Sequence, residues 1–592
     1  MEAAPHFSPA DADTSTHLDL SPSRRLGGVL VPVFALRTED DLGIGDTAGL
    51  KTFIDWAADA GFRMVQILPI NETGGDHSPY NAISSLALEP TTLRLSPEAL
   101  PDLSAADYQA ELAGVDLAAL RRGSVNYAIV KPLKRRLLER AFASFEHHHL
   151  GYGTERDAAF AEFTEKNAAW LGDYAMFRTL MERHGNTECW DRWPEGQRSS
   201  AEVRAWLDTQ SEEERAVLPP RMEFHGYVQW IAYTQWEEVK RHATARGVAL
   251  MGDIPFGVSY YSADVWSRPG DFRLHWSGGA PPEPYFKDDA FTQKWGQNWG
   301  IPLYDWDAMR KSDFAWWRAR VGGVRDVFHV FRIDHILGFY RIYGFPWRPE
   351  RNAEFLPLTP AQAQEKTGGR LPGFQPRADD TYEHAEANRR EGEEYLKMVL
   401  AAAGDTALIG EDLGTVPDYV RPSLTALGIA GFKIPIWEPD PATNYQRLIR
   451  PEHYAPLSVA TFGTHDHEPL VVYWRQHARV LSGEIAGDRG EAQRELDKLA
   501  DWADLPRETR TFEFSPDVHA HLLHALFRTR SWLAVVMITD LLGTPDRFNV
   551  PGTAATSNWS RRLARTVAEL RADPPVVALT ERVRAMLKET GR

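Results

Sequence analysis

The sequence predicts an α/β protein built on a (β/α)8 TIM barrel, with helical insertion subdomains around the mouth of the barrel. Two observations predict this fold. Short apolar runs recur along the chain with helical segments between them, and most of these runs end on a carboxylate. In such barrels the carboxyl ends of the strands form the active-site face, so acids at strand ends would converge on one pocket. A chain of 592 residues has room for such a barrel with large insertions.

The first strand, helix and strand of this barrel follow one another between residues 29 and 70. Residues 29–34 (Val-Leu-Val-Pro-Val-Phe) form an apolar run suited to a buried parallel strand. A helix follows, with Asp46 as its expected N-cap and Gly61 as its expected stop. Residues 64–70 then form a second strand. This order predicts a parallel sheet with a right-handed crossover.

Six further apolar runs complete the eight strands that the barrel requires. They lie at residues 248–253, 327–334, 407–411, 431–436, 458–466 and 534–540. Five of these runs finish on an acid: Asp253, Asp334, Glu411, Asp466 and Asp540. Any one of these acids could cap the helix after its strand, because Asp is common in that role. Five acids at corresponding strand ends are better explained by a shared pocket.

The rest of the chain divides into a tail and two insertions. Residues 1–25 are rich in Ala, Pro, Ser and Asp and predict a flexible tail ahead of a single catalytic domain at 26–592. Residues 90–225 contain helical runs at 129–143 and 173–184 and predict a helical subdomain beside the active-site mouth. Residues 348–395 are charged and poor in apolar residues, so we expect a long loop with room for one helix.

Composition and charge narrow the range of partners. The formal net charge of -17 is unlike the basic surfaces that bind nucleic acids or anionic membranes. No run approaches the ~20 apolar residues that span a bilayer, and the first 25 residues lack the pattern of a secretory signal. Cys189 is the only cysteine, which excludes an internal disulfide and a cysteine-built zinc site. We expect a cytoplasmic protein, either a monomer or a weak dimer, without nucleic-acid or membrane partners.

The strand-end acids suggest glycosyl chemistry. Strand alternation puts Arg332 on the same side as Asp334, and a neighbouring guanidinium favours the charged form of a carboxylate, so Asp334 suits a nucleophile. Glu411 ends an apolar strand with no arginine beside it in sequence. Desolvation would raise its pKa, as a general acid requires. The 20 tryptophans could supply rings that stack on sugars, although large residues also simply fill a large core.

A metal site is the competing interpretation of these residues. His465, His467 and His335 lie close to aspartates in the sequence and could bind zinc or another divalent ion. Metal-dependent barrel hydrolases usually begin with a His-x-His pair on the first strand, however, and residues 29–34 have none. His465 is therefore better interpreted as a hydrogen-bond donor to a sugar hydroxyl, with a purely structural histidine as the alternative.

Three motifs resemble the nucleophile, acid/base and stabiliser motifs of the 4-alpha-glucanotransferases, the amylomaltases or disproportionating enzymes of glycoside hydrolase family 77 in the alpha-amylase clan. They are Phe-Arg-Ile-Asp-His at 331–335, Ile-Gly-Glu-Asp-Leu-Gly at 409–414 and Gly-Thr-His-Asp at 463–466. Supporting stretches follow in order over about residues 26–575, and such an ordered set is far more specific than one motif. They are Ser78-Pro79-Tyr80, Gly252-Asp253-Ile254-Pro255, Ser262-Ala263-Asp264-Val265-Trp266, Asn298-Trp299-Gly300 and Asn549-Val550-Pro551-Gly552-Thr553.

The resemblance implies a retaining double displacement. Asp334 would form a covalent glucosyl-enzyme intermediate, Glu411 would act first as acid and then as base, and Asp466 would hold the sugar hydroxyls. The acceptor would be the 4-hydroxyl of glucose or a second glucan, with maltose, malto-oligosaccharides or other α-1,4-glucans as substrates and no metal or organic cofactor. The resemblance also carries over substrate contacts, to Arg332, His465, Asp253, Tyr80, Asp264 and Trp299.

The sequence departs from the common pattern of this family at three places. The 348–395 insertion separates Asp334 from Glu411 by more residues than in compact bacterial members, and residues 334–342 are closer to the plant cytosolic enzymes that act on maltose. His467 follows Asp466 where Asn or Thr is more usual. The donor and acceptor preference therefore stays open. So do two other functions: a hydrolase of the alpha-amylase clan that gives the same intermediate to water, and a catalytically silent glucan-binding protein.

Overall fold

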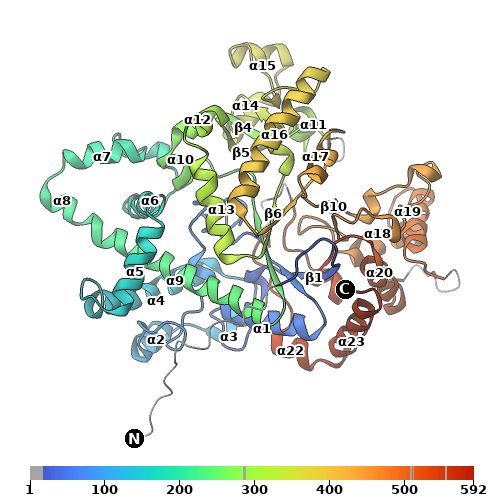
Figure 1. Cartoon of the computed structure of the whole chain (residues 1–592), viewed down its shortest axis with the longest axis horizontal. Helices are drawn as coiled ribbons and strands as arrows, with labels where there is room; N and C mark the ends of the chain where they lie inside the picture. The colour runs from blue at the N-terminus through green and yellow to red at the C-terminus, as the bar shows by residue number, and fades with distance from the viewer. Residues whose placement is uncertain (1–17, 284–288, 507–509, 511–512, 552, 554–556) are drawn as a thin grey trace, which may run out of the picture.

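The computed structural model describes residues 18–283, 289–506, 510, 513–551, 553 and 557–592 (Figure 1). Eight parallel strands form one sheet, in the order β10-β11-β12-β1-β2-β3-β6-β9. The strands are β1 Leu26–Leu30, β2 Met64–Gln66, β3 Ala249–Ile254, β6 Val330–Ile333, β9 Ala407–Gly410, β10 Gly431–Lys433, β11 Ser458–Ala460 and β12 Leu533–Met537. Each contains part of an apolar run that the sequence predicts as a strand, so all eight predicted strands are present.

The sheet closes into a barrel between β9 and β10. Ile409 and Ala430 form a parallel bridge there, and the N–H of Gly410 donates to the carbonyl oxygen of Ala430 at 2.9 Å. The strands are almost wholly buried, with Val29 and Phe331 among the side chains that expose no surface. The fold class predicted from the sequence is therefore confirmed.

The first helix of the barrel begins and ends where the sequence predicts. In α1 (Thr47–Asp59) the N-cap Asp46 accepts a hydrogen bond from the N–H of Gly49 at 2.9 Å. Gly61 follows the helix with a φ of 95°, a conformation that residues with a side chain rarely adopt. The chain can then turn directly into β2.

The insertion between β2 and β3 is helical. Most of its helices form the cyan and green lobe at the left of Figure 1, and α2 and α3, drawn in light blue, lie lower in the view. They are α2 Ala105–Leu112, α3 Leu117–Arg122, α4 Tyr127–His148, α5 Glu155–Lys166, α6 Leu171–Arg183, α7 Ser200–Asp208 and α8 Glu212–Ala216. The long helix α9 (Leu218–Ala245) packs against α6 and against α1, and so joins this lobe to the barrel.

Residues 348–395 are not a long loop, and that prediction is wrong. They contain α14 (Asn352–Phe355), α15 (Pro360–Lys366), strand β8 (Gly373–Gln375) and most of α16 (Tyr382–Ala403), in the upper part of Figure 1. The charged residues that led to the loop prediction lie largely on the solvent side of α16, where Arg389 pairs with Glu386 and Glu393. Such i,i+3 and i,i+4 pairs support an exposed helix face.

The sequence did not predict a second sheet, which has four antiparallel strands. Strand β8 forms its edge, in the order β5-β4-β7-β8. The other strands are β4 Phe272–Ala280, β5 Gln297–Tyr304 and β7 Ile342–Phe345. Because β7 comes shortly after β6, this sheet stands next to the strand end that carries Asp334.

The remaining helices lie between the later strands and at the carboxyl end. They are α10 Ala263–Ser267, α11 Ala290–Trp295, α12 Trp306–Lys311, α13 Ala315–Val327, α17 Val420–Ala426, α18 Leu470–Ser482, α19 Arg489–Trp502, α20 Pro516–Arg528, α21 Ile538–Leu542, α22 Val567–Ala572 and α23 Pro574–Glu589. No helix in the described ranges is both long and apolar enough to cross a bilayer.

The predicted amino-terminal tail falls mostly outside the described residues, which begin at 18. From there to residue 25 the chain lies against the protein. Leu18 and Leu20 pack partly buried against the core, and Arg25 donates to the carbonyl oxygens of Thr529 and Thr590. The predicted division into tail and single catalytic domain remains a prediction.

Candidate active site

The carboxyl ends of neighbouring barrel strands bring the predicted acids together. In β3 and β6, Asp253 lies opposite Arg332, and Arg332 in turn lies opposite Ile409 of β9. Asp334 and Glu411 are the first residues after β6 and β9. Three adjacent strands therefore deliver three carboxylates and one guanidinium to the same edge of the barrel.

Arg332 holds two of these carboxylates at once. Its Nη1 lies 2.5 Å from Asp253 Oδ2, and its Nη2 lies 2.5 Å from Asp334 Oδ1. Burial disfavours the charge of Arg332, but the two carboxylates outweigh burial and raise its pKa above the usual value. Burial raises the pKa of Asp253, although Arg332 opposes this change. Asp334 keeps 32% of its side chain exposed, so it is held in place yet open to a ligand.

Glu411 is a buried carboxyl group held by the backbone. Its Oε2 accepts from the N–H of His335 at 2.8 Å, and its Oε1 accepts from the N–H of Leu413 at 2.8 Å. His335 has a φ of 49°, a left-handed conformation, at the turn where the chain leaves β6. Burial raises the pKa of Glu411 to about 7, and the negative charge of Asp334 adds to the shift. The sequence predicted this direction and its main cause.

Asp466 lies in the loop between β11 and α18. Asn549 Nδ2 donates to its Oδ1 at 2.5 Å, His465 Nε2 lies 3.3 Å from the same oxygen, and Arg547 donates to its backbone carbonyl oxygen. Burial by itself raises the pKa of Asp466, but His465 and Asn549 outweigh burial and lower it below the usual value. Asp466 is therefore ionised at neutral pH.

An aromatic wall stands beside these acids. The rings of Tyr80 and His465 stack with centroids 4.8 Å apart and an interplanar angle of 12°. The Tyr80 hydroxyl donates to Asp253 Oδ2 at 2.6 Å. Trp559 lies against both rings, with centroids 5.8 Å from Tyr80 and 5.7 Å from His465. Tyr80, His465 and Asp253 thus form one hydrogen-bonded and stacked group.

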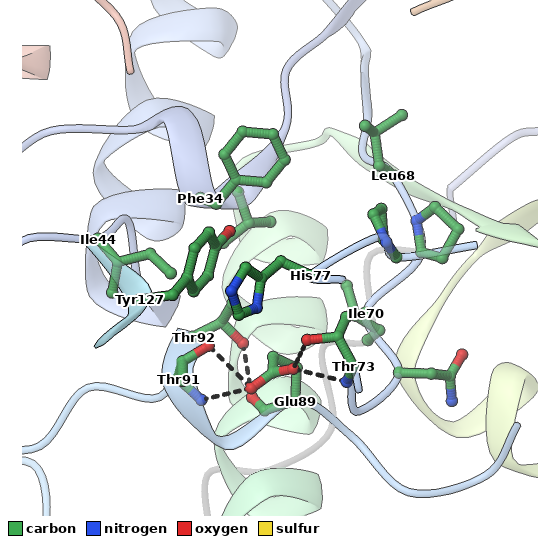
Figure 2. Close-up of a pocket in the computed structure, with 14 residues that line it drawn as sticks. Phe34, Ile44, Leu68, Ile70, Thr73, His77, Glu89, Thr91, Thr92 and Tyr127 are labelled. Carbon is green, nitrogen blue, oxygen red and sulfur yellow. Dashed lines mark hydrogen bonds between the residues drawn. The ribbon is translucent and has the colours of Figure 1, made fainter. Parts of the chain in front are cut away.

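The segment that carries Tyr80 is anchored by the buried carboxylate of Glu89. This group accepts from the N–H and the hydroxyl of Thr73, both at 2.8 Å, and from the N–H and hydroxyl of Thr91 (Figure 2). Lys131 of α4 donates to the carbonyl oxygens of Thr73 and Gly74. The base of the segment is thereby tied to the helical insertion.

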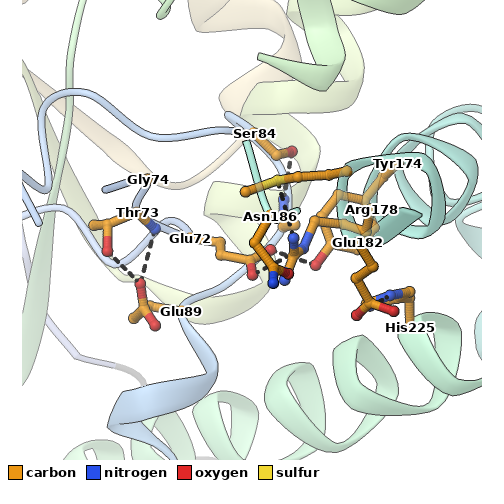
Figure 3. Close-up of polar contacts among 12 residues, drawn as sticks. Glu72, Thr73, Gly74, Ser84, Glu89, Tyr174, Arg178, Glu182, Asn186 and His225 are labelled. Carbon is orange, nitrogen blue, oxygen red and sulfur yellow. Dashed lines mark hydrogen bonds and ion pairs between the residues drawn. The ribbon is translucent and has the colours of Figure 1, made fainter. Parts of the chain in front are cut away.

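A second anchor on the same segment is Glu72. Arg178 Nε lies 3.1 Å from Glu72 Oε1, and the hydroxyl of Tyr174 donates to Glu72 Oε2 (Figure 3). Tyr174 and Arg178 both belong to α6 of the helical insertion. Burial raises the pKa of Glu72, although Arg178 opposes this change. The insertion therefore supports one wall of the site from outside the barrel.

The structure places Trp299 next to the acids and Asp264 away from them. Trp299 is 40% exposed and meets the ring of His335 edge-on, with centroids 4.9 Å apart. The carboxylate of Asp264 is buried and accepts from the N–H and the hydroxyl of Ser85 and from the indole of Trp316. These contacts are those of a structural anchor, and the structure does not bring Asp264 to the site with the other predicted residues.

Asp540, the fifth strand-end acid, does not join the cluster either. It lies in α21, where its Oδ1 accepts from the N–H of Leu470 at 2.7 Å and so caps the first turn of α18. Burial raises the pKa of Asp540 to about 7. The expectation that all five acids converge is therefore wrong for this one, which takes the capping role considered as the alternative.

Three residues of the site carried no assignment from the sequence. Asn549 stands in a stretch that was noted only as supporting the family resemblance. Arg547 and Trp559 have no local signal, because nothing in their surroundings distinguishes this arginine or this tryptophan from the others. Arg547 reaches Asp466, and Trp559 reaches His465, from a segment more than 80 positions further along the chain.

The histidines near the site do not assemble a metal centre. Nδ1 of His467 turns back toward its own loop, where it lies 2.9 Å from the N–H of Thr464. Throughout the described part of the chain, no three His, Cys, Asp or Glu side chains come together in an arrangement that could hold a metal ion.

Comparison with known proteins connects this geometry to a family. The family model described as 4-alpha-glucanotransferase matches residues 31–567. The chain is 31% identical to a 4-alpha-glucanotransferase of Chlamydia pneumoniae over 551 residues, which cover 92% of each chain. Its fold is similar to that of an amylomaltase from Streptococcus agalactiae, solved in complex with acarbose, with a TM-score of 0.72, 24% identity and coverage of 96% of this chain and 100% of that one.

A second solved structure also has a similar fold. An amylomaltase from Corynebacterium glutamicum has a TM-score of 0.74 and 22% identity, over 95% of this chain and 75% of that one. At such identities the two structures establish the shared fold.

Proposed function

The chain belongs to the 4-alpha-glucanotransferase family, and on that premise we propose that it moves α-1,4-glucan segments by a retaining double displacement through Asp334. The protein is a transferase: it takes a glucan segment from a donor and passes it to the 4-hydroxyl of an acceptor. The roles of individual residues are our proposal, and they rest on the geometry around Arg332 and Glu411.

Asp334 is the proposed nucleophile. Arg332 holds one carboxylate oxygen at 2.5 Å while the side chain stays partly exposed, so the group is charged, oriented and accessible. A nucleophile of this kind attacks the anomeric carbon of the donor sugar and forms the covalent glycosyl-enzyme intermediate. Asp253 shares the guanidinium and keeps Arg332 in position throughout.

Glu411 is the proposed acid and base. The observation that carries the proposal is that burial raises the pKa of Glu411 and that the negative charge of Asp334 raises it further. With a pKa of about 7, Glu411 holds a proton in a substantial fraction of molecules at neutral pH and can donate it to the leaving oxygen. When Asp334 becomes an ester it loses its negative charge, and the part of the shift that this charge causes disappears. The pKa of Glu411 then falls, as a base that activates the acceptor hydroxyl requires.

Asp466 is the proposed stabiliser. It is held ionised by His465 and Asn549, and it can accept hydrogen bonds from sugar hydroxyls that strengthen in the transition state. Tyr80 and His465 would contact the same sugar, with Tyr80 fixed by Asp253. Maltose, malto-oligosaccharides and other α-1,4-glucans are the substrates we propose, without a cofactor and in the cytoplasm.

Digestion of maltotriose tests this function. Transfer yields glucose together with maltotetraose and longer products, because each released segment is passed to another sugar. A hydrolase of the same clan would yield only glucose and maltose. The products are resolved by chromatography at early times. The absence of any product longer than maltotriose would exclude the proposed reaction.

A further inference from the structure

A pocket of about 210 Å³ opens on the side of Glu411 that faces the second sheet. Glu411, His335 and Trp299 line one part of it, and Tyr343 and Phe374 line another. Tyr80, Asp253, Arg332, His465 and Asp466 do not line it. The general acid of a retaining glycosidase stands between the donor sugar and the leaving group. The pocket therefore lies on the side where the leaving sugar departs and the acceptor enters.

Phe374 comes to this pocket from β8, within the segment that the sequence marked as an insertion. It pairs with Tyr343 of β7 in the antiparallel sheet, and the two rings meet edge-on with centroids 5.4 Å apart. The guanidinium carbon of Arg341 lies 3.5 Å from the ring centroid of Phe374. The ring is half-buried, so it keeps exposed surface in the pocket that it lines.

The Arg341 side chain that supports the ring is itself fixed. Its Nε lies 2.6 Å from Asp379 Oδ2. Asp379 Oδ1 accepts from Asn388 Nδ2 at 2.9 Å and from the hydroxyl of Tyr419 at 3.1 Å. Arg341 and Asp379 are mostly buried, so the network is screened from solvent. Phe374 is therefore held rigidly, as a ring that binds a ligand at low entropic cost must be.

We propose that Phe374 is a stacking platform for the second sugar of the acceptor, in a channel that begins at Glu411 and passes Trp299. The ligand class is an α-1,4-linked acceptor of two or more glucose units, whose apolar ring faces pack on aromatic side chains. Glucose reaches only the part of the channel next to Glu411, and so does not touch Phe374. This inference rests on the proposed function of Glu411 and adds the residue that selects for acceptor length.

The test uses a donor whose leaving group is fluoride and whose non-reducing 4-hydroxyl is removed, so that the donor cannot itself accept a segment. With this 4''-deoxy-α-maltotriosyl fluoride at a saturating concentration, glucose, maltose or maltotriose is varied as the acceptor, and KM and kcat for transfer are measured. The Phe374→Ala variant should show a KM for maltose and maltotriose about tenfold higher, which corresponds to about 1.4 kcal/mol. The KM for glucose should stay within twofold of the native value, and kcat should change little with any acceptor.

Two further variants separate stacking from structural support. Phe374→Tyr keeps the ring face and should restore the native KM for maltose. Tyr382→Ala removes an aromatic ring from the same insertion at a position that is 80% exposed and does not line the pocket, and should change no acceptor KM. If Phe374→Ala raised KM equally for glucose and maltose, or lowered kcat with every acceptor, Phe374 would only support the sheet. Either result would overturn the proposal.

Failure of this inference and failure of the proposed function give different results. Release of fluoride reports attack by Asp334 and needs no acceptor sugar. If Asp334→Asn still released fluoride at the native rate, the nucleophile would be misassigned, whatever Phe374 does. If Asp334→Asn is inactive but Phe374→Ala binds maltose as the native protein does, only the acceptor platform is wrong.

Discussion

At the scale of single residues, Arg332 lies between Asp253 and Asp334 and uses a different terminal nitrogen for each carboxylate. Arginine suits this position because its planar fork donates in two directions, which the single ammonium of lysine does not match. Among the described residues Glu411 has no such side-chain partner, and its oxygens are held by backbone N–H groups. The difference between a charged nucleophile and a protonated acid therefore follows from which group each carboxylate faces.

Replacement of Glu411 tests the acid and base role. Glu411→Gln keeps the size of the side chain but removes the proton that is donated, so turnover of maltotriose should fall by roughly 10²-fold to 10⁴-fold. Binding of maltotriose, followed by calorimetry, should change less than threefold. Asp540→Asn is a matched control, because Asp540 is also a buried acid with a pKa of about 7 but caps a helix outside the site. Native turnover in Glu411→Gln would contradict the assignment.

The pH dependence of activity follows from the same pKa. Donation to a sugar leaving group needs protonated Glu411, so kcat/KM for maltotriose should fall tenfold per pH unit above about pH 7. Fluoride leaves without a full proton transfer. With α-maltosyl fluoride, the rate of fluoride release should therefore stay nearly level between pH 7 and 9. An equal alkaline fall with both donors would point to another group.

The sequence could identify most of these residues and not their partners. Asp334, Glu411 and Asp466 are found because acids at the ends of apolar strands are unusual and occur within specific motifs. Asp540 also ends an apolar strand, and Asp264 also lies in a stretch that supports the family resemblance, yet Leu470 and Ser85 occupy their oxygens. Which acids face a cavity and which cap a backbone is decided by contacts between distant segments.

At the scale of elements, the barrel strands were predictable and the second sheet was not. A strand such as β12 is buried along its whole length, so its apolar run is continuous. In β4, exposed and buried positions are mixed without regular alternation, and the pairing with β5 has register shifts. Strand β8 has only three residues and is fixed by its pairing with β7. Such strands are defined by their partners, which sequence periodicity cannot show.

The helical insertion supports the site through Glu72 and Arg178, and this support can be measured. Arg178→Met leaves the buried carboxylate of Glu72 without its cation, so the free energy of unfolding should fall by about 3–5 kcal/mol. The turnover of maltotriose should fall as well, because Glu72 lies at the base of the segment that carries Tyr80. Guanidinium unfolding and initial rates measure the two effects.

The double variant Glu72→Gln/Arg178→Met is the control for this pair. It removes both charges, so it should recover much of the stability that Arg178→Met loses. A double variant as unstable as the single one would mean that Arg178 acts through packing, for example through its contact with Met181.

At the scale of the whole molecule, the function of Glu411 has a cost in stability that depends on pH. The pKa of Glu411 and that of Asp540 are both raised to about 7 in the folded protein, from ordinary values of 4.5 and 3.8. Between these values and pH 7 the folded state binds more protons than the unfolded state. Each group therefore lowers the free energy of unfolding as pH rises through this window, by up to about 1.4 kcal/mol per pH unit.

Variants of Glu411 and Asp540 separate the effect of these two acids on the pH dependence of stability from the effect of every other titrating group. In guanidinium unfolding at pH 5 and pH 8, the native protein should lose more stability between the two pH values than Glu411→Gln or Asp540→Asn, and the double variant should lose the least. Because an amide does not ionise, each variant should be relatively more stable at pH 8. A pH dependence identical in all four proteins would mean that neither acid is protonated in the fold, and Glu411 could not then supply the proton that transfer requires.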